Sequence, residues 1–492
     1  MTYHLLTGAT GLLGSYLLRD NLRAGHRLAV LVRPSKRESA RRRVESILSR
    51  CEAELRTILP RPVVIEGELT EVDLGMDGGD LRWISRHCRS VIHNAASLTF
   101  HSNGRDSEPW LSNLEGTRRI LDLCRTTGIR QFHYVSTAYV AGRRQGRVLE
   151  TELDVGQTPG NAYEHSKIEA EKLVLGTPWI DPPTIYRPSI IVGDSQTGYT
   201  ATFHGFYVMV KLAHTLVSRM ARGSTAGRLM VAGLGLTGSE HKNLVPVDWV
   251  SAVFTRIFSE TKHHGRTYHL VSRRPPSLSL IADVIQQAVE QYSTLASEGD
   301  ECVCSGQWFL DSFRQQMEIY SAYWRDDPQF DDSQRAAAVR LSCPELDAAM
   351  LMKLAHFAIH SNFGRDRSRK ARPDFDIHDY LHKLPGKPLM PDLTGNHCLG
   401  LDVCGPAGGQ WKLLLRDGRL TAVENGISPQ CSAVFRLDAR TFRAMGDRHL
   451  AAVEAMRTGR VVIEGNGLDT SHLAAILQAT AVRELAQVAE PI

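Results

Sequence analysis

The sequence predicts an α/β protein whose last part is a smaller α+β domain, and three observations carry this prediction. Over the first half of the 492 residues, short apolar runs alternate with amphipathic stretches, which is the pattern of a parallel sheet wrapped by helices. The first apolar run leads directly into a glycine-rich turn, Thr7 to Gly14. After residue 393 the pattern changes to alternating strands around Asp417-Gly418, a pair typical of β-hairpins.

The elements of the first half are bounded by turn residues. All but the fourth strand are followed within a few residues by Gly, Pro, Ser or Thr. The expected strands are His4–Thr7, Arg27–Val32, Val63–Glu66, Ser90–His93, Gln131–Val135 and Thr184–Tyr186. Amphipathic spacing predicts helices at Leu12–Ala24, Glu38–Ile58 and Asn113–Thr127.

The regular alternation stops near Gly198. Aromatic and small residues between Phe203 and Arg222 predict a helix that suits a cover over a substrate. Further helices are expected at Leu278–Ser293, Gly306–Arg325 and Pro344–Ser361. The charged run from Arg365 to Lys370 predicts a solvated loop.

A linker is expected at 384–393, because Leu384 to Pro391 holds three prolines and a glycine in eight residues. Such a segment breaks helices and central strands. The strands expected beyond it are Gln410–Leu415, Arg419–Val423, Cys431–Leu437 and Val461–Glu464. The helices expected there are Ala439–Met445, His449–Arg457 and a last one from Thr470.

Composition narrows the class of protein. Hydrophobic residues make up 42% and charged residues 23%, as in ordinary globular proteins, and the net charge of +4 gives no reason to expect a nucleic-acid partner. The nine cysteines are scattered without zinc spacing, so we expect reduced thiols and no metal. Since we find no run of ~18 apolar residues, we expect a cytoplasmic protein without an integral membrane segment.

The glycine-rich turn has the spacing Gly-x-x-Gly-x-x-Gly between a strand and a helix. Glycines there let the backbone approach a pyrophosphate at a helix N-terminus, where free N–H groups and the helix dipole favour negative charge. We therefore expect a doubly wound, Rossmann-type sheet that binds a nicotinamide cofactor. The residues expected to contact the cofactor in this turn are Thr7, Gly8, Thr10, Gly11, Leu12, Leu13 and Gly14.

Arg33 directly follows the second predicted strand, with Lys36 close behind and no acidic residue among the four residues after Arg33. An acid at this place suits the ribose of NAD, whereas an arginine accommodates the 2′-phosphate of NADP. The sequence therefore favours NADPH, with Lys36 either assisting or merely solvated. Glu68 after the third strand either meets the adenine edge or faces solvent, and Asn94-Ala95-Ala96 after the fourth lets the chain pass close to the cofactor.

Three residues are candidates for catalysis. Tyr163 and Lys167 lie one helical turn apart, so they share a face, and the lysine ammonium is expected to lower the pKa of the tyrosine. Thr137 follows the fifth strand at the carboxyl edge of the sheet, where ligands of such sheets bind. We expect Tyr163 and Thr137 to hold a carbonyl oxygen and Lys167 to hold the ribose hydroxyls. Ser136 competes for the role of Thr137.

These motifs resemble the extended short-chain dehydrogenases/reductases, and most closely their thioester-reductase and fatty-acyl-reductase (male-sterility-type) branch. Leu31-Val32-Arg33 and the long insert Pro34–Leu59 point to this branch, over about residues 3 to 290. The resemblance implies that Pro188 to Gly193, including Pro188 and Ile190, lies beside the nicotinamide. Glu68 departs from the aspartate usual in the family, and the residues after about 290 match no tail of the branch.

The last hundred residues resemble a sterol-carrier-protein-like lipid-binding domain. The residues that carry this resemblance are Trp411 to Gly418, Ala433 to Leu437, Phe442 and Thr458 to Gly465. A curved sheet covered by helices can enclose an apolar tunnel, and the plainer alternative is a packed α+β domain with a filled core.

The expected layout is an NADP-binding domain at 1–260 with substrate elements at 198–245, then a mostly helical cover at 261–383, the linker, and a lipid-binding domain at 394–492. The leading hypothesis is an NADPH-dependent reductase of a lipid-like acyl thioester, on coenzyme A or an acyl carrier protein, that yields an aldehyde or alcohol. The alternatives are a dehydrogenase of a sterol-like or isoprenoid alcohol, and a lipid-transfer protein with a structural Rossmann domain. A homodimer is compatible with the sequence, which does not fix the oligomeric state.

Overall fold

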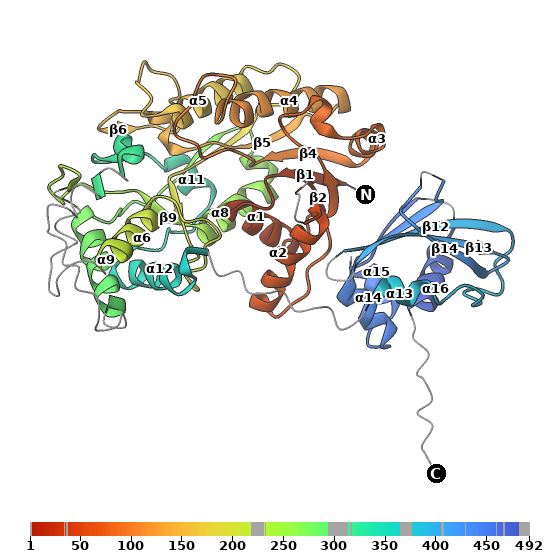
Figure 1. Ribbon diagram of the computed structural model, residues 1–492. Helices are drawn as coiled ribbons and strands as arrows, with labels where there is room; N and C mark the ends of the chain where they lie inside the picture. Colours follow the sequence, from red (N-terminus) through yellow and green to blue (C-terminus); the bar gives the residue numbers. More distant parts are fainter. Residues whose placement is uncertain are drawn as a thin grey trace, which may run out of the picture. The chain divides into compact units, whose positions relative to one another are not determined.

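In the computed structural model the chain forms two compact units (Figure 1). The first consists of residues 1–24, 30–33 and 66–368, and the second of residues 25–29, 34–65 and 369–492. The structure describes residues 2–33, 35, 38–217, 231, 233–293, 313–314, 317–364, 376–404, 408–428, 430–458, 460–465 and 468–481. Among these residues, no helix is long and apolar enough to cross a bilayer.

A seven-stranded sheet has the order β10-β7-β5-β4-β1-β2-β3. Its strands are β1 (Tyr3–Thr7), β2 (Leu28–Val32), β3 (Val63–Glu66), β4 (Cys88–His93), β5 (Gln131–Val135), β7 (Thr184–Pro188) and β10 (Thr267–Leu270). The pairs β1–β4, β4–β5, β5–β7 and β7–β10 are parallel. From β1 the sheet continues with β2 and β3 on one side and with β4, β5, β7 and β10 on the other, which is the doubly wound order. The predicted Rossmann-type sheet is confirmed.

Helices cover this sheet, and the three helices that the sequence predicts in the first half begin within three residues of their predicted starts. The helices on the sheet are α1 (Leu12–Arg23), α3 (Gly78–His87), α4 (Gly116–Thr127), α5 (Ala162–Leu175) and α8 (Val247–Ser259), while α2 (Ala40–Leu55) lies in the segment between β2 and β3 that belongs to the second unit. The predicted helix over 113–127 is correct only from Gly116, because a π-helical turn, η2 (Leu111–Glu115), precedes it. The strand β10 was not predicted from the sequence.

A helical region follows, as expected. Its longer helices are α6 (Phe206–Val217), α9 (Leu278–Ser293) and α12 (Ala348–His360), with the short α11 (Ser333–Ala338) between the last two. Apolar side chains of α6, α9 and α12 form one buried cluster. Two short parallel pairs accompany them, β8 (Ile190–Val192) with β9 (Leu244–Pro246) and β6 (Arg147–Val148) with β11 (Gln329–Phe330). Short helical turns complete the unit: η1 (Val72–Gly75), η3 (Ala138–Ala141), η4 (Thr261–His263), η5 (Glu318–Tyr323) and η6 (Asn362–Gly364).

Two predictions in this region concern residues that are largely undescribed. Of the helix expected at 306–325, the structure gives the 3-10 turn η5 and a few residues before it. The charged run 365–370 lies outside the described residues.

The second unit holds a five-stranded sheet in the order β14-β13-β12-β15-β16. Its elements are α13 (Ile377–Leu381), β12 (Asn396–Cys404), β13 (Gly409–Arg416), β14 (Arg419–Asn425), β15 (Ala433–Asp438), α14 (Ala439–Gly446), α15 (Ala452–Arg457), β16 (Val462–Gly465) and α16 (Thr470–Ala481). The predicted hairpin is confirmed, because Asp417 and Gly418, both with positive φ, join antiparallel β13 and β14. An extensive apolar core includes Trp411, Phe435 and Phe442.

The segment 384–393, predicted as a linker, is built into this second unit. Leu384, Leu389 and Leu393 are buried in its core. The Gly386 N–H donates to the Leu420 carbonyl at 2.7 Å, and the Leu420 N–H donates back to Lys387 at 3.0 Å. Prolines remove backbone donors from the segment, but its remaining N–H groups and leucines attach it to the hairpin.

The excursion 34–65, which contains α2, also belongs to the second unit. Arg61 is buried and lies against three carboxylates, those of Glu45 (Nη2 to Oε1, 2.9 Å), Glu52, and Asp438 (Nε to Oδ2, 3.4 Å). Burial raises the pKa of Glu45 to about 7, although Arg61 opposes this shift. Charged groups are removed from water here only because each has an opposite charge beside it.

Candidate active site

The glycine turn after β1 has the geometry that the motif predicts. Gly8 has φ +71°, and a Cβ there would lie 2.7 Å from the Ala95 backbone. The Gly11 N–H donates to the Gly8 carbonyl at 3.1 Å, which closes the turn. A Cβ at Gly14 would lie 1.9 Å from the Gly8 oxygen, so the first turn of α1 can pack on the loop only without a side chain there.

The end of β4 is fixed to the end of β1 through Thr7. Its hydroxyl accepts the N–H groups of Asn94 (3.2 Å) and Ala95 (3.1 Å) and is bonded to Nδ1 of His93 (2.8 Å). Burial lowers the pKa of His93 to about 3, so this ring is neutral. The Asn94 amide donates to the Gly8 carbonyl at 3.3 Å. These bonds fix the loop where the strand order reverses, the place at which such sheets bind ligands.

At this edge of the sheet the glycine turn is open on its outer side and two buried hydroxyls have no hydrogen-bond partner within the described residues. Both features are compatible with a bound dinucleotide. A Cβ at Gly11 would meet only the Gly8 oxygen, at 3.5 Å, so the outer side of the turn is open. Ser136 after β5 and Ser189 after β7 are buried, and their hydroxyls have no hydrogen-bond partner within the described residues. Buried hydroxyls without hydrogen-bond partners are uncommon in folded proteins, so these two are candidates to bind a ligand.

Arg33 lies after β2, where the sequence places it. Its Nε is 3.5 Å from the Glu68 carboxylate, with 71% of the arginine side chain and 24% of the glutamate side chain exposed. Lys36 lies outside the described residues. An exposed guanidinium held by a carboxylate at this strand end is compatible with a 2′-phosphate, and the preference for NADPH stays a prediction.

Tyr163 and Lys167 lie on α5, which begins after Asn161, whose side chain accepts the Glu164 N–H at 2.9 Å. The Lys167 ammonium donates to the Val135 carbonyl at 2.6 Å and lies 4.4 Å from the centre of the Tyr134 ring. Burial lowers the pKa of Lys167 to about 7, and the Glu171 carboxylate opposes this shift.

Thr137 and Tyr163 are brought together. The Thr137 hydroxyl accepts the Tyr139 N–H at 3.2 Å and lies 3.4 Å from the Pro188 carbonyl. Burial raises the pKa of Tyr163, and a hydrogen bond with Thr137 opposes the rise. The expected lowering of the tyrosine pKa by Lys167 does not occur in this arrangement, because the ammonium faces the Val135 carbonyl and burial dominates.

The structure also places residues that the motifs do not indicate. The Phe100 ring meets Tyr163 edge-on at 6.0 Å and Tyr320 at 5.4 Å, and it lies 5.6 Å from Tyr323. Glu164 is buried beside Tyr163 and accepts the Gly160 N–H at 2.6 Å. Only Glu164 had a signal in the sequence, its place next to the tyrosine. Ile190, expected beside the nicotinamide, begins β8 and donates its N–H to the Asn243 carbonyl at 3.1 Å.

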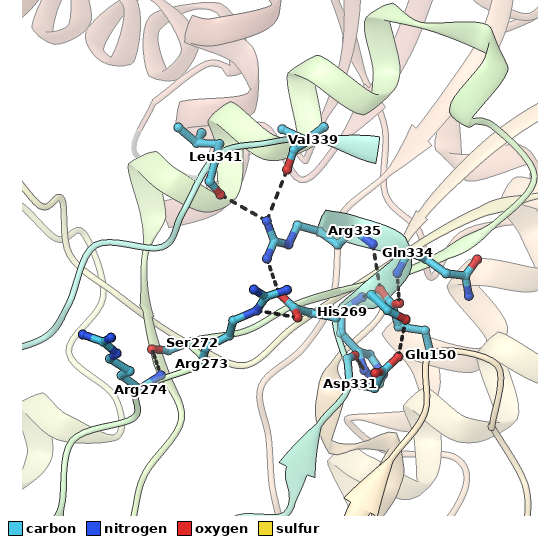
Figure 2. Close-up of polar contacts among 12 residues, drawn as sticks. Glu150, His269, Ser272, Arg273, Arg274, Asp331, Gln334, Arg335, Val339 and Leu341 are labelled. Atoms are coloured by element: carbon cyan, nitrogen blue, oxygen red, sulfur yellow. Dashed lines mark hydrogen bonds and ion pairs between the residues drawn. The ribbon is translucent and has the colours of Figure 1, made fainter. Parts of the chain in front are cut away.

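A second polar cluster fastens α11 of the helical region to the sheet (Figure 2). The buried Glu150 carboxylate accepts the N–H groups of His269 (2.9 Å), Gln334 (2.6 Å) and Arg335 (3.2 Å). Arg335 in turn donates to the carbonyls of Val339 and Leu341. A cavity of about 340 Å³ beside this cluster contains none of the predicted site residues; it is lined by Arg147, Arg273, Gln329, Phe330, Asp331, Asp332 and Ser333.

The doubly wound parallel sheet, the glycine turn at its switch point and the Tyr-x-x-x-Lys pair beside a strand-end threonine define a class of protein. It is the class of NAD(P)-dependent oxidoreductases with the extended short-chain dehydrogenase/reductase fold.

The family within this class follows from comparison. The model of the family described as male sterility protein matches residues 6–254 of the 492, just over half of the chain. The chain belongs to this family, and it is an NAD(P)-dependent reductase of the extended short-chain dehydrogenase/reductase type. The predicted resemblance to the male-sterility-type branch is confirmed.

Curated relatives match over part of their length. The aldehyde reductase lnaA of Aspergillus flavus is 28% identical over 332 residues, which are 64% of this chain and 30% of that protein. The hybrid PKS-NRPS synthetase ucsA of an Acremonium species is 33% identical over 202 residues, which are 39% of this chain and 5% of the synthetase. The chain therefore spans less than a third of these relatives.

Solved structures support the same fold. The terminal R domain of the myxalamid PKS-NRPS pathway has a TM-score of 0.56 at 24% identity and covers 74% of this chain and 92% of its own. The R domain of a non-ribosomal peptide synthetase from Mycobacterium tuberculosis has a TM-score of 0.51 at 19% identity, with coverage of 74% and 92%.

Proposed function

We propose that this reductase uses NADPH to convert a lipid-like acyl thioester, held on coenzyme A or on a carrier protein, to an aldehyde or an alcohol. The observation that carries the proposal is that Tyr163 on α5 interacts with Thr137 at the carboxyl end of β5, where Lys167 of the same helix donates to the Val135 carbonyl at 2.6 Å. This arrangement puts two hydroxyl groups beside each other on the sheet edge that also holds the glycine turn.

In this mechanism the nicotinamide, when bound, supplies the hydride to the thioester carbonyl carbon. Tyr163 and Thr137 donate hydrogen bonds to the carbonyl oxygen, and one such donor in a well-formed site contributes about 2.7–4 kcal/mol to the stability of the transition state. Because burial raises the pKa of Tyr163, its hydroxyl stays protonated at neutral pH and can donate. Lys167 holds the ribose hydroxyls, and the hemithioacetal of the substrate collapses to aldehyde and thiol.

The choice of NADPH is supported by Arg33, which follows β2 without an acidic residue among the next four. The remaining residues proposed to contact the cofactor are those of the glycine turn, Asn94, Ala95, Ala96, Lys36, Pro188 and Ile190.

A carrier-bound thioester is supported by the kinds of protein that contain similar domains. One solved relative is a thiolation-reductase di-domain from an archaeal non-ribosomal peptide synthetase, with a TM-score of 0.55 and 18% identity over 74% of this chain and 76% of its own. In such an arrangement the reductase receives its acyl group from a neighbouring carrier. For this chain we propose the same class of substrate, without a choice between carrier protein and coenzyme A.

We also propose that residues 394–492 form a sterol-carrier-like domain that holds the apolar part of the substrate. A five-stranded sheet whose β12, β13 and β15 bury leucine, phenylalanine and tryptophan side chains supports this role. Trp411 is buried in that core, so a brominated fatty acid in the interior should quench its fluorescence. Quenching that is equal in the native protein and in Trp411→Phe would argue for a filled, purely structural core.

The test of the activity is NADPH oxidation over a panel of long-chain acyl-coenzyme A thioesters, with Tyr163→Phe as the control. Release of free thiol in step with NADPH loss, abolished in the variant, is the expected result. Silence on every thioester, together with reduction of NADP⁺ by a sterol-like alcohol, would instead establish the dehydrogenase alternative.

A further inference from the structure

Two cysteine thiols meet in the second unit, and neither cysteine is among the residues assigned to the reductase reaction. Sγ of Cys398 on β12 lies 3.2 Å from Sγ of Cys431, which comes just before β15. Neither cysteine is fully buried. Outside this pair, the cysteines whose side chains the structure describes are Cys51, Cys88, Cys124 and Cys343, and the first three are buried.

The backbone holds this pair in register. The Ser432 N–H donates to the Cys398 carbonyl at 2.9 Å, and from Leu399 and Ala433 onward the two strands pair in parallel. The Cys431 N–H donates to the Ser428 carbonyl at 3.0 Å, which fixes the turn before it. The two sulfur atoms of a disulfide are about 2.05 Å apart. Forming this bond from the observed arrangement therefore requires rotation of the two side chains and little backbone movement.

We propose that Cys398 and Cys431 form a redox-active dithiol that a small-molecule disulfide such as oxidised glutathione converts to an intramolecular disulfide. This inference does not rest on the proposed reductase function.

The reaction balances as a thiol–disulfide exchange. The Cys431 thiolate attacks one sulfur of oxidised glutathione, which forms a mixed disulfide and releases one glutathione thiolate. The Cys398 thiolate then attacks the Cys431 sulfur, which forms the Cys398–Cys431 bond and releases the second glutathione. The two cysteines are oxidised, the glutathione disulfide is reduced to two thiols, and the two cysteine protons pass to the two glutathione thiolates through solvent.

The order of attack follows from the surroundings of Cys398. Burial and the hydrogen bond with Cys431 raise the pKa of the Cys398 thiol to about 11, and the Glu424 carboxylate acts in the same direction against the nearby Lys412 ammonium. The thiolate is the attacking form, so Cys398 is the poorer first nucleophile and acts as the resolving cysteine.

The bond would tie β12 to the segment that leads into β15 and enclose the β13–β14 hairpin in a covalent loop. A loop of this kind restricts the unfolded chain, so oxidation should raise the thermal unfolding midpoint of the protein by a few degrees. Reduction with dithiothreitol should return the midpoint to its starting value.

The test equilibrates the full chain with excess oxidised glutathione, alkylates the remaining thiols and maps the peptides by mass spectrometry. Cys398 and Cys404 share a tryptic peptide, so a second cleavage before Asp402 is needed to separate them. The expected product joins the peptides of Cys398 and Cys431 with the loss of two hydrogen atoms, in the native protein and in the control variants Cys343→Ser and Cys404→Ser. Both Cys398→Ser and Cys431→Ser should lack it and lack the rise in unfolding midpoint.

Alkylated Cys398 and Cys431 after this treatment would overturn the proposal, as would glutathione that stays on Cys431 without closure onto Cys398. A cross-link that persists in Cys398→Ser would show that another cysteine is the partner and would also overturn it.

Discussion

The buried ion cluster of the second unit and the candidate active site of the first unit both contain charged and polar side chains, but these are paired in different ways. In the second unit Arg61 lies against Glu45, Glu52 and Asp438, so a buried cation is surrounded by carboxylates of the same unit. At the candidate active site the buried Lys167 ammonium meets a backbone carbonyl, and the hydroxyls of Ser136 and Ser189 have no partner among the described residues. Paired buried charges stabilise a fold, whereas unpartnered donors at a strand edge prepare a place for a ligand.

The largest effect that this comparison predicts is on chemistry at the active site. Tyr163→Phe removes one hydroxyl that is a hydrogen-bond and proton donor in the proposed mechanism, so kcat/KM for a thioester should fall by about 10²–10⁴. The unfolding midpoint should change little, because the ring that packs against Phe100 is kept. Steady-state kinetics and thermal unfolding of the same preparation measure the two effects, and a variant with near-native kcat/KM would remove Tyr163 from catalysis.

In the second unit a substitution is expected to lower stability. Arg61→Met leaves three buried carboxylates without their cation, and breaking a buried ion pair from one side costs about 3–5 kcal/mol of unfolding free energy. Arg440→Met is the matched control, because this arginine also approaches Glu52, at 3.6 Å, but is 63% exposed. Such an exposed pair contributes about 0–1 kcal/mol. Urea unfolding followed by tryptophan fluorescence compares the two variants, and equal losses would contradict the structural role of Arg61.

A third prediction concerns pH. Burial lowers the pKa of Lys167 from 10.5 to about 7, so in the free enzyme its side chain is charged below pH 7 and neutral above it. A charged ammonium attracts the anionic cofactor, so the Kd of NADPH should rise as pH rises through about 7, by at most about tenfold per pH unit. Titration calorimetry should also detect proton uptake on binding above pH 7. In Lys167→Met this part of the pH dependence should vanish, and an unchanged profile there would assign it to another group.

Local sequence patterns correctly predicted elements whose bounds follow general rules of strand and turn composition. The strands Val63–Glu66 and Gln131–Val135 have the predicted bounds, because apolar runs between turn residues leave few alternatives. The strand β12 was missed, since Gly400 and Asp402 interrupt its apolar alternation. In the structure Gly400 is required, because a Cβ there would lie 2.9 Å from Val434. Such a reason depends on the neighbouring strand and cannot be seen in a local pattern.

The candidate site likewise contains residues that local sequence patterns predict and residues that they do not. Thr137, Tyr163 and Lys167 were predicted from local spacing, and the structure brings Thr137 and Tyr163 into contact. The aromatic wall of Phe100, Tyr320 and Tyr323 was not predicted, because it joins residues more than two hundred positions apart. The tyrosine pKa was predicted in the wrong direction, since spacing along a helix says nothing of how deeply the helix is buried.

The smallest predicted effect tests most directly whether buried hydroxyls without hydrogen-bond partners mark the ligand site. The Ser189 hydroxyl is buried and has no partner within the described residues, so Ser189→Ala should leave the unfolding free energy of the cofactor-free protein unchanged or slightly higher. If that hydroxyl serves a ligand, the same variant should weaken NADPH binding by about 0.5–1.5 kcal/mol, the net contribution of one hydrogen bond. Thermal unfolding with and without NADPH measures both quantities in one experiment. Thr117→Ala is the contrast, because its hydroxyl already bonds Nε2 of His93 at 3.0 Å and the Asn113 carbonyl at 2.6 Å. It should lower stability directly, and a Ser189→Ala variant that behaves in the same way would mean that unpartnered hydroxyls do not mark the ligand site.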